Sequence, residues 1–310
     1  MNEFTKIPYI FEKRDRILVI GDIHGDFRRL VHILVRDLGV IDEKLNWIAE
    51  PPDTVIVQMG DQVDSCRSNC HKEKKSDKSD DISVLKFMTD LHIIASKKGG
   101  MVLSLLGNHE LMNVQGNFDY VSRNNNDVTI YNSWTGENDK VISRRDAFRQ
   151  GGVLSSFLAT TRMCCVIIGS WVFVHGGYSE ESGSIEQINS TIYKWLMNLT
   201  VDDDLVDKIL NDEKTSIFWN RAVGKIQQNL SKDSDICRKN ADPFLKMYPG
   251  KKLVVGHTIQ DDGITSTCGT NIYRVDTAIS SAFDEFGIKK RQVMEIIEDK
   301  DVRYIDLSII

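Results

Sequence analysis

The stretch Ile17-Leu18-Val19-Ile20-Gly21-Asp22-Ile23-His24-Gly25-Asp26 decides the fold class of this chain. Its four leading apolar residues predict a short buried strand, which stops where glycine lets the backbone turn sharply. Beyond it, apolar residues recur at spacings of three and four, which predicts an amphipathic helix: Phe27, Leu30, Val31, Ile33, Leu34 and Leu38. A buried strand that leads directly into a helix is typical of an α/β protein.

The same arrangement returns twice. Residues 54–57 predict a second buried strand that ends at Gly60, and residues 101–105 predict a third that ends at Gly107. A helical pattern between them runs from Ile82 to Ile94. Alternation of strands and helices predicts parallel pairing of the strands.

Later apolar runs extend the sheet content. Strands are expected at residues 164–168, 171–174 and 253–255, and in the tail at 272–275, 293–297 and 303–307, where we expect antiparallel pairing. The sum is a mixed, two-sheet α/β protein. No linker divides the chain, so we expect a single domain over residues 1–310, with a polar surface insertion at 112–141 and a helical segment at 184–249.

Composition limits the class of protein. The 310 residues are 41% hydrophobic and 27% charged, with a formal net charge of -6, which favours a globular protein over a general nucleic-acid binder. No apolar run approaches the roughly 20 residues that span a bilayer, and the N-terminus has no apolar signal core. We therefore expect a soluble intracellular, cytoplasmic protein with no nucleic-acid or membrane partner.

The cysteines carry little information. Six of them in a chain of this length form no obvious disulfide framework. Cys66 and Cys70, followed by His71, suggest a structural zinc, but no second pair of ligands lies nearby. We prefer reduced thiols in a polar loop.

Polar fragments follow five of the expected strands. They are Gly21 to Asp26, Gly60-Asp61-Gln62-Val63-Asp64, Gly107-Asn108-His109-Glu110, His175-Gly176-Gly177 and Gly256-His257-Thr258. Ligands bind beyond the carboxyl ends of such strands, so these side chains are expected to converge on one crevice.

Their donor set suits a pair of metal ions. Two divalent ions about 3.5–4 Å apart can clamp a phosphoryl group and activate a water. Mixed oxygen and nitrogen donors favour manganese, iron or zinc over magnesium alone. The candidate ligands are Asp22, His24, Asp61, Asn108, His175 and His257. His32, His71 and His92 are interpreted as ordinary helix or loop residues, and Asp26 and Glu110 as residues that brace the site.

Together these fragments resemble the calcineurin-like metallophosphoesterases, and among them the phosphoprotein phosphatases, from about residue 16 to residue 281. Two segments are similar to the Shewanella-like phosphatases. One runs from Gly256-His257-Thr258-Ile259-Gln260 to Val275-Asp276-Thr277, and the other is Arg145-Asp146-Ala147-Phe148. The resemblance implies two mixed β-sheets packed as a sandwich and flanked by helices, a four-layer fold.

The resemblance also implies roles. Asp22 and His24 would bind one metal ion, Asp61 would bridge both, and the second ion would take Asn108, His175 and His257. A metal-bridging hydroxide would attack phosphorus directly. His109 would be the general acid, hydrogen-bonded to Asp64, since a carboxylate partner raises the pKa of a histidine.

One position departs from the family pattern. The family has an arginine directly after the residue that matches Asp64, where this chain has Ser65-Cys66-Arg67. We hypothesise that Arg67 replaces it through a loop shift, because a guanidinium fork suits phosphate oxygens. Arg221 resembles a second clamp residue of the family, and Arg145 is a weaker candidate. Both Arg144 and Arg145 are otherwise expected to be solvated helix charges.

Three points stay open. Asp276 either orients His257 or is a turn residue at the end of a strand. The substrate is a phosphoprotein or phosphopeptide carrying phosphoserine, phosphothreonine or phosphotyrosine, or alternatively a dinucleoside tetraphosphate. A low-activity scaffold for phosphorylated partners is a third interpretation, which an intact His109 and Asp64 pair disfavours. The oligomeric state is not predicted.

Overall fold

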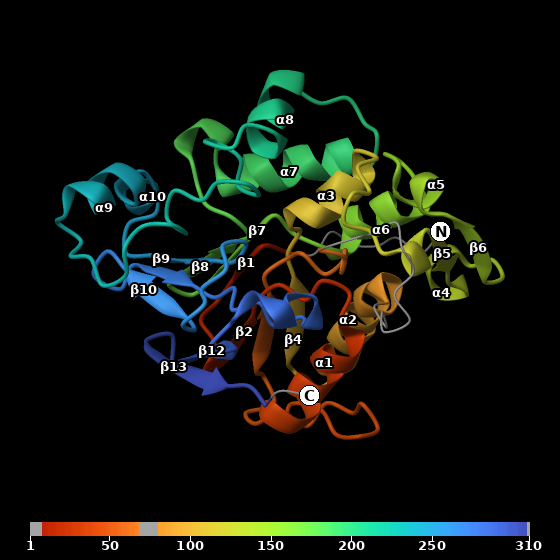
Figure 1. Ribbon diagram of the computed structural model, residues 1–310, viewed down its shortest axis with the longest axis horizontal. Helices are drawn as coiled ribbons and strands as arrows, with labels where there is room; N and C mark the ends of the chain where they lie inside the picture. Colours follow the sequence, from red (N-terminus) through yellow and green to blue (C-terminus); the bar gives the residue numbers. More distant parts are fainter. Residues whose placement is uncertain (1–7, 68–79, 309–310) are drawn as a thin grey trace.

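Two β-sheets face one another and carry helices on their outer sides (Figure 1). The computed structural model describes residues 8–67 and 80–308. Strand order is β13-β12-β2-β3-β4 in the five-stranded sheet and β1-β7-β8-β9-β11-β10 in the six-stranded sheet, and β5 pairs with β6 in a separate hairpin. The predicted mixed, two-sheet α/β sandwich is confirmed.

The five-stranded sheet contains the strand that opened the sequence argument. Its strands β2 (Arg16–Ile20), β3 (Val55–Gln58) and β4 (Met101–Ser104) are parallel, as predicted. The tail adds β12 (Gln292–Ile297) and β13 (Asp301–Asp306), and β12 is antiparallel to both β2 and β13.

The six-stranded sheet corrects one detail of the tail. β11 was expected to pair only in an antiparallel manner, yet it is parallel to β9 and antiparallel to β10. The reason is that β10 takes the edge of the sheet, so the chain turns back once before β11 inserts next to β9. The strands are β1 (Ile10–Phe11), β7 (Cys165–Ile168), β8 (Trp171–Val174), β9 (Lys252–Val255), β10 (Thr265–Thr267) and β11 (Ile272–Arg274).

Successive side chains of each strand point to opposite faces of its sheet and so belong to different layers of the core. In β2, Ile17 and Val19 belong to the core between the sheets, while Leu18 and Ile20 belong to the core beneath the helices. Each strand is therefore buried on both faces, which explains its uninterrupted apolar sequence. Helices α1 (Phe27–His32) and α2 (Asp81–Ser96) cover this outer face, and a π-helical turn extends α1 over Ile33–Asp37.

Most of the remaining helices belong to the opposite outer layer (Figure 1). Those of at least eight residues are α6 (Val153–Thr161), α7 (Ile185–Leu196) and α8 (Asp203–Leu210). The shorter ones are α3 (Asn108–Val114), α4 (Asn132–Thr135), α5 (Arg144–Phe148), α9 (Asp235–Asn240) and α10 (Asp242–Met247), with 3-10 turns at Arg123–Asn125, Glu180–Ser182 and Ser281–Phe286.

The segment expected to be a surface insertion, residues 112–141, also contributes to the core. It begins inside α3 and contains β5 (Asp127–Ile130), which pairs with β6 (Lys140–Ser143). Val128 and Ile130 are buried with the helices of the outer layer. Its polar composition conceals this because the hairpin presents only alternate residues to the core. The segment 184–249 holds α7 to α10, but residues 211–234 are irregular. That the chain is one domain stays a prediction.

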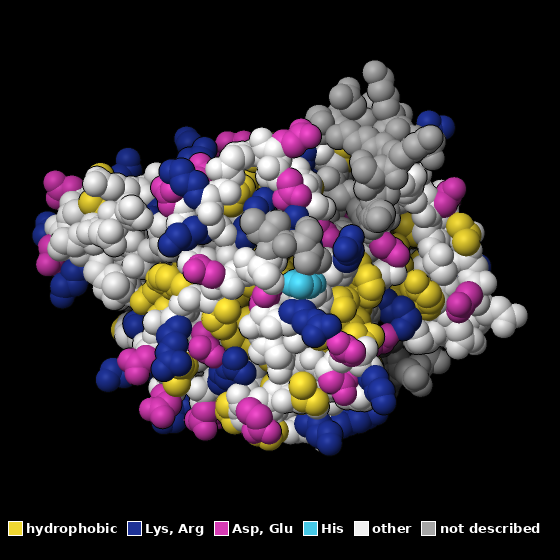
Figure 2. Space-filling view, turned by 60° about the horizontal axis from the view of Figure 1, so that its bottom comes forward, with side chains coloured by type: hydrophobic (Ala, Val, Ile, Leu, Met, Phe, Trp, Pro, Cys, Tyr) yellow, Lys and Arg dark blue, Asp and Glu magenta, His cyan; other side chains and the backbone are white. Residues whose placement is uncertain are grey.

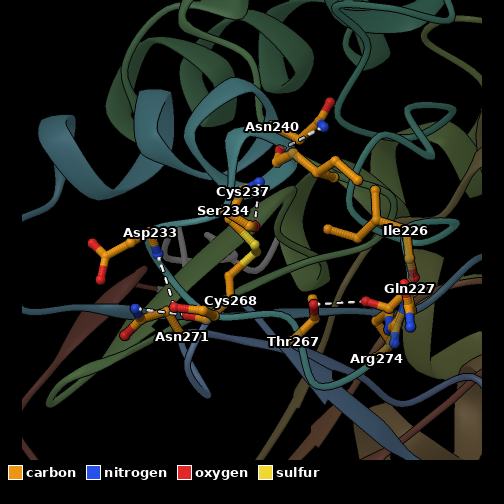
Figure 3. Close-up of a disulfide and its surroundings, with 12 residues drawn as sticks. Ile226, Gln227, Asp233, Ser234, Cys237, Asn240, Thr267, Cys268, Asn271 and Arg274 are labelled. Atoms are coloured by element: carbon orange, nitrogen blue, oxygen red, sulfur yellow. Dashed lines mark hydrogen bonds between the residues drawn. A yellow bond between two sulfur atoms is a disulfide. The ribbon is translucent and has the colours of Figure 1, made fainter.

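The cysteine prediction was wrong. Cys237 of α9 is disulfide-bonded to Cys268, between β10 and β11, so the bond fastens α9 to the edge of the six-stranded sheet (Figure 3). Cys66 is disulfide-bonded as well, whereas Cys164 and Cys165 are buried thiols. The two disulfide partners in Figure 3 lie 31 residues apart in the sequence, so spacing alone did not reveal them. Cys70 and His71 lie outside the described residues.

No helix within residues 8–67 and 80–308 has the length and apolarity that a membrane crossing requires.

Candidate metal centre

Four of the predicted site residues share an unusual backbone conformation. The φ angles of His24, Asp61, Asp64 and His257 are 46°, 51°, 70° and 61°. Residues other than glycine rarely adopt this left-handed region, and such strain concentrates at functional sites. His24, Asp61 and His257 follow strand ends and belong to the candidate metal-ligand groups, whereas the side chain of Asp64 is directed at His109.

Glu110 holds two of these turns together. Its buried carboxylate accepts hydrogen bonds from the backbone N–H groups of Asp61, Gln62 and Val63 at 3.0, 2.7 and 3.2 Å, and from Gly107 at 2.7 Å. These bonds satisfy backbone donors that have no partner within the sheet. The structure therefore gives Glu110 a bracing position.

Glycine at positions 60 and 107 permits a close approach of the same two turns. Gly60 has a φ of 95°, and a Cβ there would meet the Gly107 nitrogen at 2.6 Å. A Cβ on Gly107 would lie 2.1 Å from Oδ1 of Asp61. A side chain at either position would push the Asp61 loop away from the Asn108 loop.

Asp61 occupies the middle of the cluster. Its Oδ2 lies 3.4 Å from Nε2 of His175, 3.8 Å from Nε2 of His24 and 3.9 Å from Nε2 of His109. Nε2 of His24 is also 4.0 Å from Oδ2 of Asp22. All of these side chains are buried, and His109 is the most accessible at 8%.

Backbone carbonyls orient two of the imidazoles. Nδ1 of His175 lies 2.8 Å from the carbonyl of Met59, and Nδ1 of His24 lies 3.1 Å from that of Val63. A proton on each Nδ1 leaves Nε2 with a lone pair directed at Asp61, the tautomer that a metal ligand needs. Nε2 of His175 also approaches Oδ1 of Asn108 at 2.9 Å.

The electrostatics of the cluster favour cations. Burial, together with nearby Asp276 and Asp61, raises the pKa of Asp22 well above its usual range. Burial would raise the pKa of Asp61 too, but His175 and His109 outweigh it and hold that pKa well below normal. Burial lowers the pKa of His24 and of His257 far below 6.5, so both imidazoles are neutral and able to ligate a metal.

These donors fit a pair of metal ions. His24, Asp61 and His109 form one group of candidate ligands, and Asp61, His175 and His257 form another, with Asp61 common to both. Nε2 of His257 is buried and, among the described residues, has no hydrogen-bond partner. A buried ring nitrogen without a partner is costly unless something occupies its lone pair, as a metal ion would.

His109 and Asp64 are brought together as predicted. Nδ1 of His109 lies 2.9 Å from Oδ2 of Asp64, which leaves Nε2 facing Asp61. Burial lowers the pKa of His109, but the charge of Asp61 and the hydrogen bond with Asp64 outweigh it, so this pKa is raised. His109 is therefore able to hold a proton beside the candidate metal ligands.

Arg144 is part of this site, contrary to its interpretation as a solvated helix charge. It is 2% exposed, and its Nη2 lies 3.0 Å from Oδ1 of Asp64 and 2.8 Å from Oδ2 of Asp81. Nε donates to Oδ1 of Asn113 at 2.5 Å, and Nδ2 of Asn113 donates to both oxygens of Asp64 at 3.0 Å. No sequence pattern distinguishes Arg144 from its exposed neighbour Arg145, because the two side chains are chemically alike.

Arg67 folds back onto its own loop. Its Nη1 donates to the carbonyls of Asp64 and Cys66, both at 2.9 Å, and its guanidinium lies 4.6 Å from the Phe283 ring centroid and 5.5 Å from that of Tyr120. Burial lowers its pKa, while the charges of nearby aspartates oppose that shift. No carboxylate in the described part of the chain is within 4.0 Å of this guanidinium.

The other predicted residues differ in how close they lie to the cluster. Arg221 follows Trp219, whose ring lies 5.7 Å from that of His257, and its charge lowers the pKa of His257. Arg145 is exposed and stacks over Phe118, and no described contact joins it to the metal ligands. Oδ1 of Asp276 accepts a hydrogen bond from the N–H of Ala278 at 2.9 Å. This is the geometry of a turn residue, one of the two alternatives for Asp276.

Charges on the molecular surface are mixed. On the face shown in Figure 2, a histidine side chain reaches the surface beside Lys and Arg side chains, and Asp and Glu side chains are interspersed among them. No single sign of charge dominates that face, in keeping with the mixed charges of the chain.

An α/β sandwich with a buried cluster of carboxylates and imidazoles at its strand ends defines the class of metallophosphoesterases. The family model of the calcineurin-like phosphoesterases matches residues 15–261. The chain belongs to this family and is a hydrolase of phosphate esters.

Relatives support the same assignment. An uncharacterised protein of Acanthamoeba polyphaga mimivirus is 38% identical over 245 residues, which cover 71% of this chain and 97% of that protein. Shewanella-like protein phosphatase 2 of Arabidopsis thaliana is 26% identical and covers 95% of this chain and 78% of its own length. Shewanella-like protein phosphatase 1 of Plasmodium berghei is 25% identical over 95% of this chain and 75% of its own.

A solved structure has the same fold. The cold-active protein-tyrosine phosphatase of a psychrophilic Shewanella species superimposes with a TM-score of 0.70 at 19% identity, over 97% of this chain and 83% of that one. The predicted resemblance to calcineurin-like and Shewanella-like phosphatases is thereby confirmed.

Proposed function

We propose that this protein is a dinuclear metal-dependent phosphatase that hydrolyses phosphomonoesters on phosphoproteins. The observation that carries the proposal is the position of the His109–Asp64 pair, with Nε2 of His109 3.9 Å from the central Asp61. A proton donor next to a metal cluster suits cleavage of an ester whose leaving oxygen needs a proton.

Two divalent ions would occupy the cluster. Asp22 and His24 would hold one, Asp61 both, and Asn108, His175 and His257 the other. When bound, such ions polarise the phosphoryl oxygens and activate a water for direct attack, without a covalent enzyme intermediate. The mixed nitrogen and oxygen donors favour manganese, with iron or zinc as alternatives.

His109 would deliver the proton to the leaving oxygen from Nε2, and Asp64 would keep it charged and oriented through Nδ1. Arg67 and Arg221 would grip the phosphoryl oxygens, because the charge of Arg67 acts on His24, that of Arg221 acts on His257, and a guanidinium can offer paired donors. Arg145, exposed over Phe118, is not part of the proposed grip.

The phosphoprotein substrate is supported by the relatives that are named protein phosphatases. The test supplies manganese and compares phosphoserine, phosphothreonine and phosphotyrosine peptides with a dinucleoside tetraphosphate. We expect a higher kcat/KM for at least one class of phosphopeptide. Faster hydrolysis of the nucleotide would replace this proposal with that of a nucleotide hydrolase.

The expected cytoplasmic location is a separate proposal, and the Cys237–Cys268 disulfide counts against it, since disulfides persist in oxidising compartments. Mass spectrometry of protein isolated from its natural source with thiols blocked tests this. A reduced pair would favour the cytoplasm, and an oxidised pair would exclude it.

A further inference from the structure

A groove of about 740 Å³ opens beside the metal centre. Two stretches of its lining come from segments that also position the metal ligands. Tyr178 and Ser179 follow the His175 loop, and Trp219, Asn220 and Arg221 follow Ile217, whose carbonyl is hydrogen-bonded to that loop. Its volume lies within the range of about 300–1,000 Å³ that is usual for ligand sites.

Hydrogen bonds tie the groove to the centre. The N–H groups of Gly176 and Gly177 donate to the carbonyl of Ile217 at 2.7 and 3.2 Å. The Trp219 ring then lies 5.7 Å from that of His257. The groove therefore borders His257 through the ring of Trp219, which lines it.

The groove carries charges of both signs. Three glutamates and three lysines line it, all of them exposed: Glu180, Glu181, Glu213, Lys214, Lys225 and Lys239. Within the described residues, none of the six forms an ion pair shorter than 4.0 Å. A lining with both signs of charge suits a polypeptide that carries acidic and basic side chains, whereas the phosphates of a nucleotide would meet the three glutamates.

Lys225 has the best-defined position. Its N–H donates to the carbonyl of Arg221 at 3.1 Å, so the two basic residues lie one turn apart. The neighbouring Gly224 leaves room for Thr258, since a Cβ there would be 2.3 Å from the Thr258 hydroxyl. Lys225 is thus fixed next to the loop that holds His257.

A second part of the groove lining is also anchored. Lys239 and Asn240 belong to the end of α9, and the Cys237–Cys268 disulfide in the same helix fastens that wall to the sheet (Figure 3). This part of the lining is therefore joined to the same six-stranded sheet whose strands β8 and β9 precede His175 and His257.

We propose that this groove binds the polypeptide that flanks the phosphorylated residue, with Lys225 pairing with an acidic substrate side chain and Glu181 with a basic one. The inference rests on the proposed phosphatase function and adds to it a means of sequence selection. Charge pairs of this kind favour some partners and reject others more than they add affinity.

The test uses three phosphopeptides with acidic, alanine or basic residues on both sides of one phosphoresidue, and a chromogenic phosphomonoester that has no flanks. For Lys225→Glu we expect KM to rise about fivefold with the acidic peptide and to fall with the basic peptide, the size of effect of an exposed charge pair. Glu181→Lys should act in the opposite direction. Turnover of the chromogenic ester should not change in either variant.

Lys246→Glu on α10 is the matched control, because Lys246 is exposed outside the groove and changes the net charge equally. If Lys225→Glu and Lys246→Glu give equal shifts, or if KM is independent of the flanks, the groove proposal is wrong. If the wild type does not hydrolyse the chromogenic ester at all, the phosphatase function itself is refuted.

Discussion

Nδ1 of His109 and Oδ2 of Asp64 lie 2.9 Å apart, and both side chains are buried. This contact fixes the direction of the imidazole and, with the charge of Asp61, raises the pKa of His109 against the effect of burial. The general-acid role depends on that raised pKa, since an acid must be protonated at the working pH.

Asp64→Asn should therefore shift the pH dependence of turnover. Activity is present below the pKa of His109 and is lost as pH rises through it, so removing the carboxylate moves this loss to lower pH. We expect kcat at pH 8 to fall about a hundredfold. A pH profile of kcat with a phosphomonoester measures this, with Asp204→Asn, exposed on α8, as the control. An unchanged alkaline limb would contradict the role of Asp64.

Arg144 should support the His109–Asp64 pair through its contact with Asp64. Arg144→Met leaves Asp64 and Asp81 buried without their cation, which costs about 3–5 kcal/mol of unfolding free energy. Arg144→Lys keeps the charge but only part of the fork, so we expect it to fold and to lose kcat with little change in KM. Denaturant unfolding and steady-state kinetics test both, and Arg145→Met on the exposed side is the matched control. Equal effects at the two arginines would contradict the assignment.

Asp81 makes stability depend on pH. Burial raises its pKa to about 6, with Arg144 opposing the shift. An acid whose pKa is raised on folding stabilises the fold below its unfolded pKa, and that contribution is lost as pH rises through the folded one. For Asp81 this loss of stability runs from about pH 4 to pH 6, and the unfolding free energy falls by about 3 kcal/mol over that range.

The comparison is with Asp81→Asn, which has no carboxylate to titrate. We expect the unfolding free energy of the wild type to decline relative to this variant between pH 4 and pH 6. Parallel curves for the two proteins, measured by urea unfolding, would show that Asp81 is ionised throughout and that Arg144 dominates.

Arg67→Ala tests the replacement of the missing family arginine. Charge-assisted hydrogen bonds contribute about 1.5–3 kcal/mol, so kcat/KM for a phosphomonoester should fall about ten- to a hundredfold. Arg67→Lys should recover part of this loss, and Arg123→Ala, exposed on its 3-10 turn, should have no effect. Unchanged KM and kcat in Arg67→Ala would refute the loop-shift hypothesis.

Local patterns predicted the central fold well. Each strand that is buried on both faces, such as β2 or β8, reads as an apolar run and was located within one or two residues. The short edge strand β1 and the hairpin of β5 and β6 were missed, because edge and half-exposed strands mix polar with apolar residues. The parallel alignment of β11 depends on which strand takes the sheet edge, and no local pattern records that.

The site shows the same division. Strand-end glycines identified the loops of Asp22, Asp61 and Asn108, because the geometry they need restricts the residue type. Arg144 and the Cys237–Cys268 bond were missed, since their partners lie far along the chain. Pairing between residues far apart in the sequence follows from the folded structure, and the spacing of residues along the chain does not reveal it.

Metal dependence is the measurement that tests the central claim most directly. Turnover of a chromogenic phosphomonoester is followed for the metal-stripped protein, before and after addition of manganese, with Asp61→Asn in parallel. The account predicts that stripping abolishes turnover, that manganese restores it in the wild type, and that Asp61→Asn is not restored. Wild-type rates in the stripped protein, or in Asp61→Asn, would contradict it.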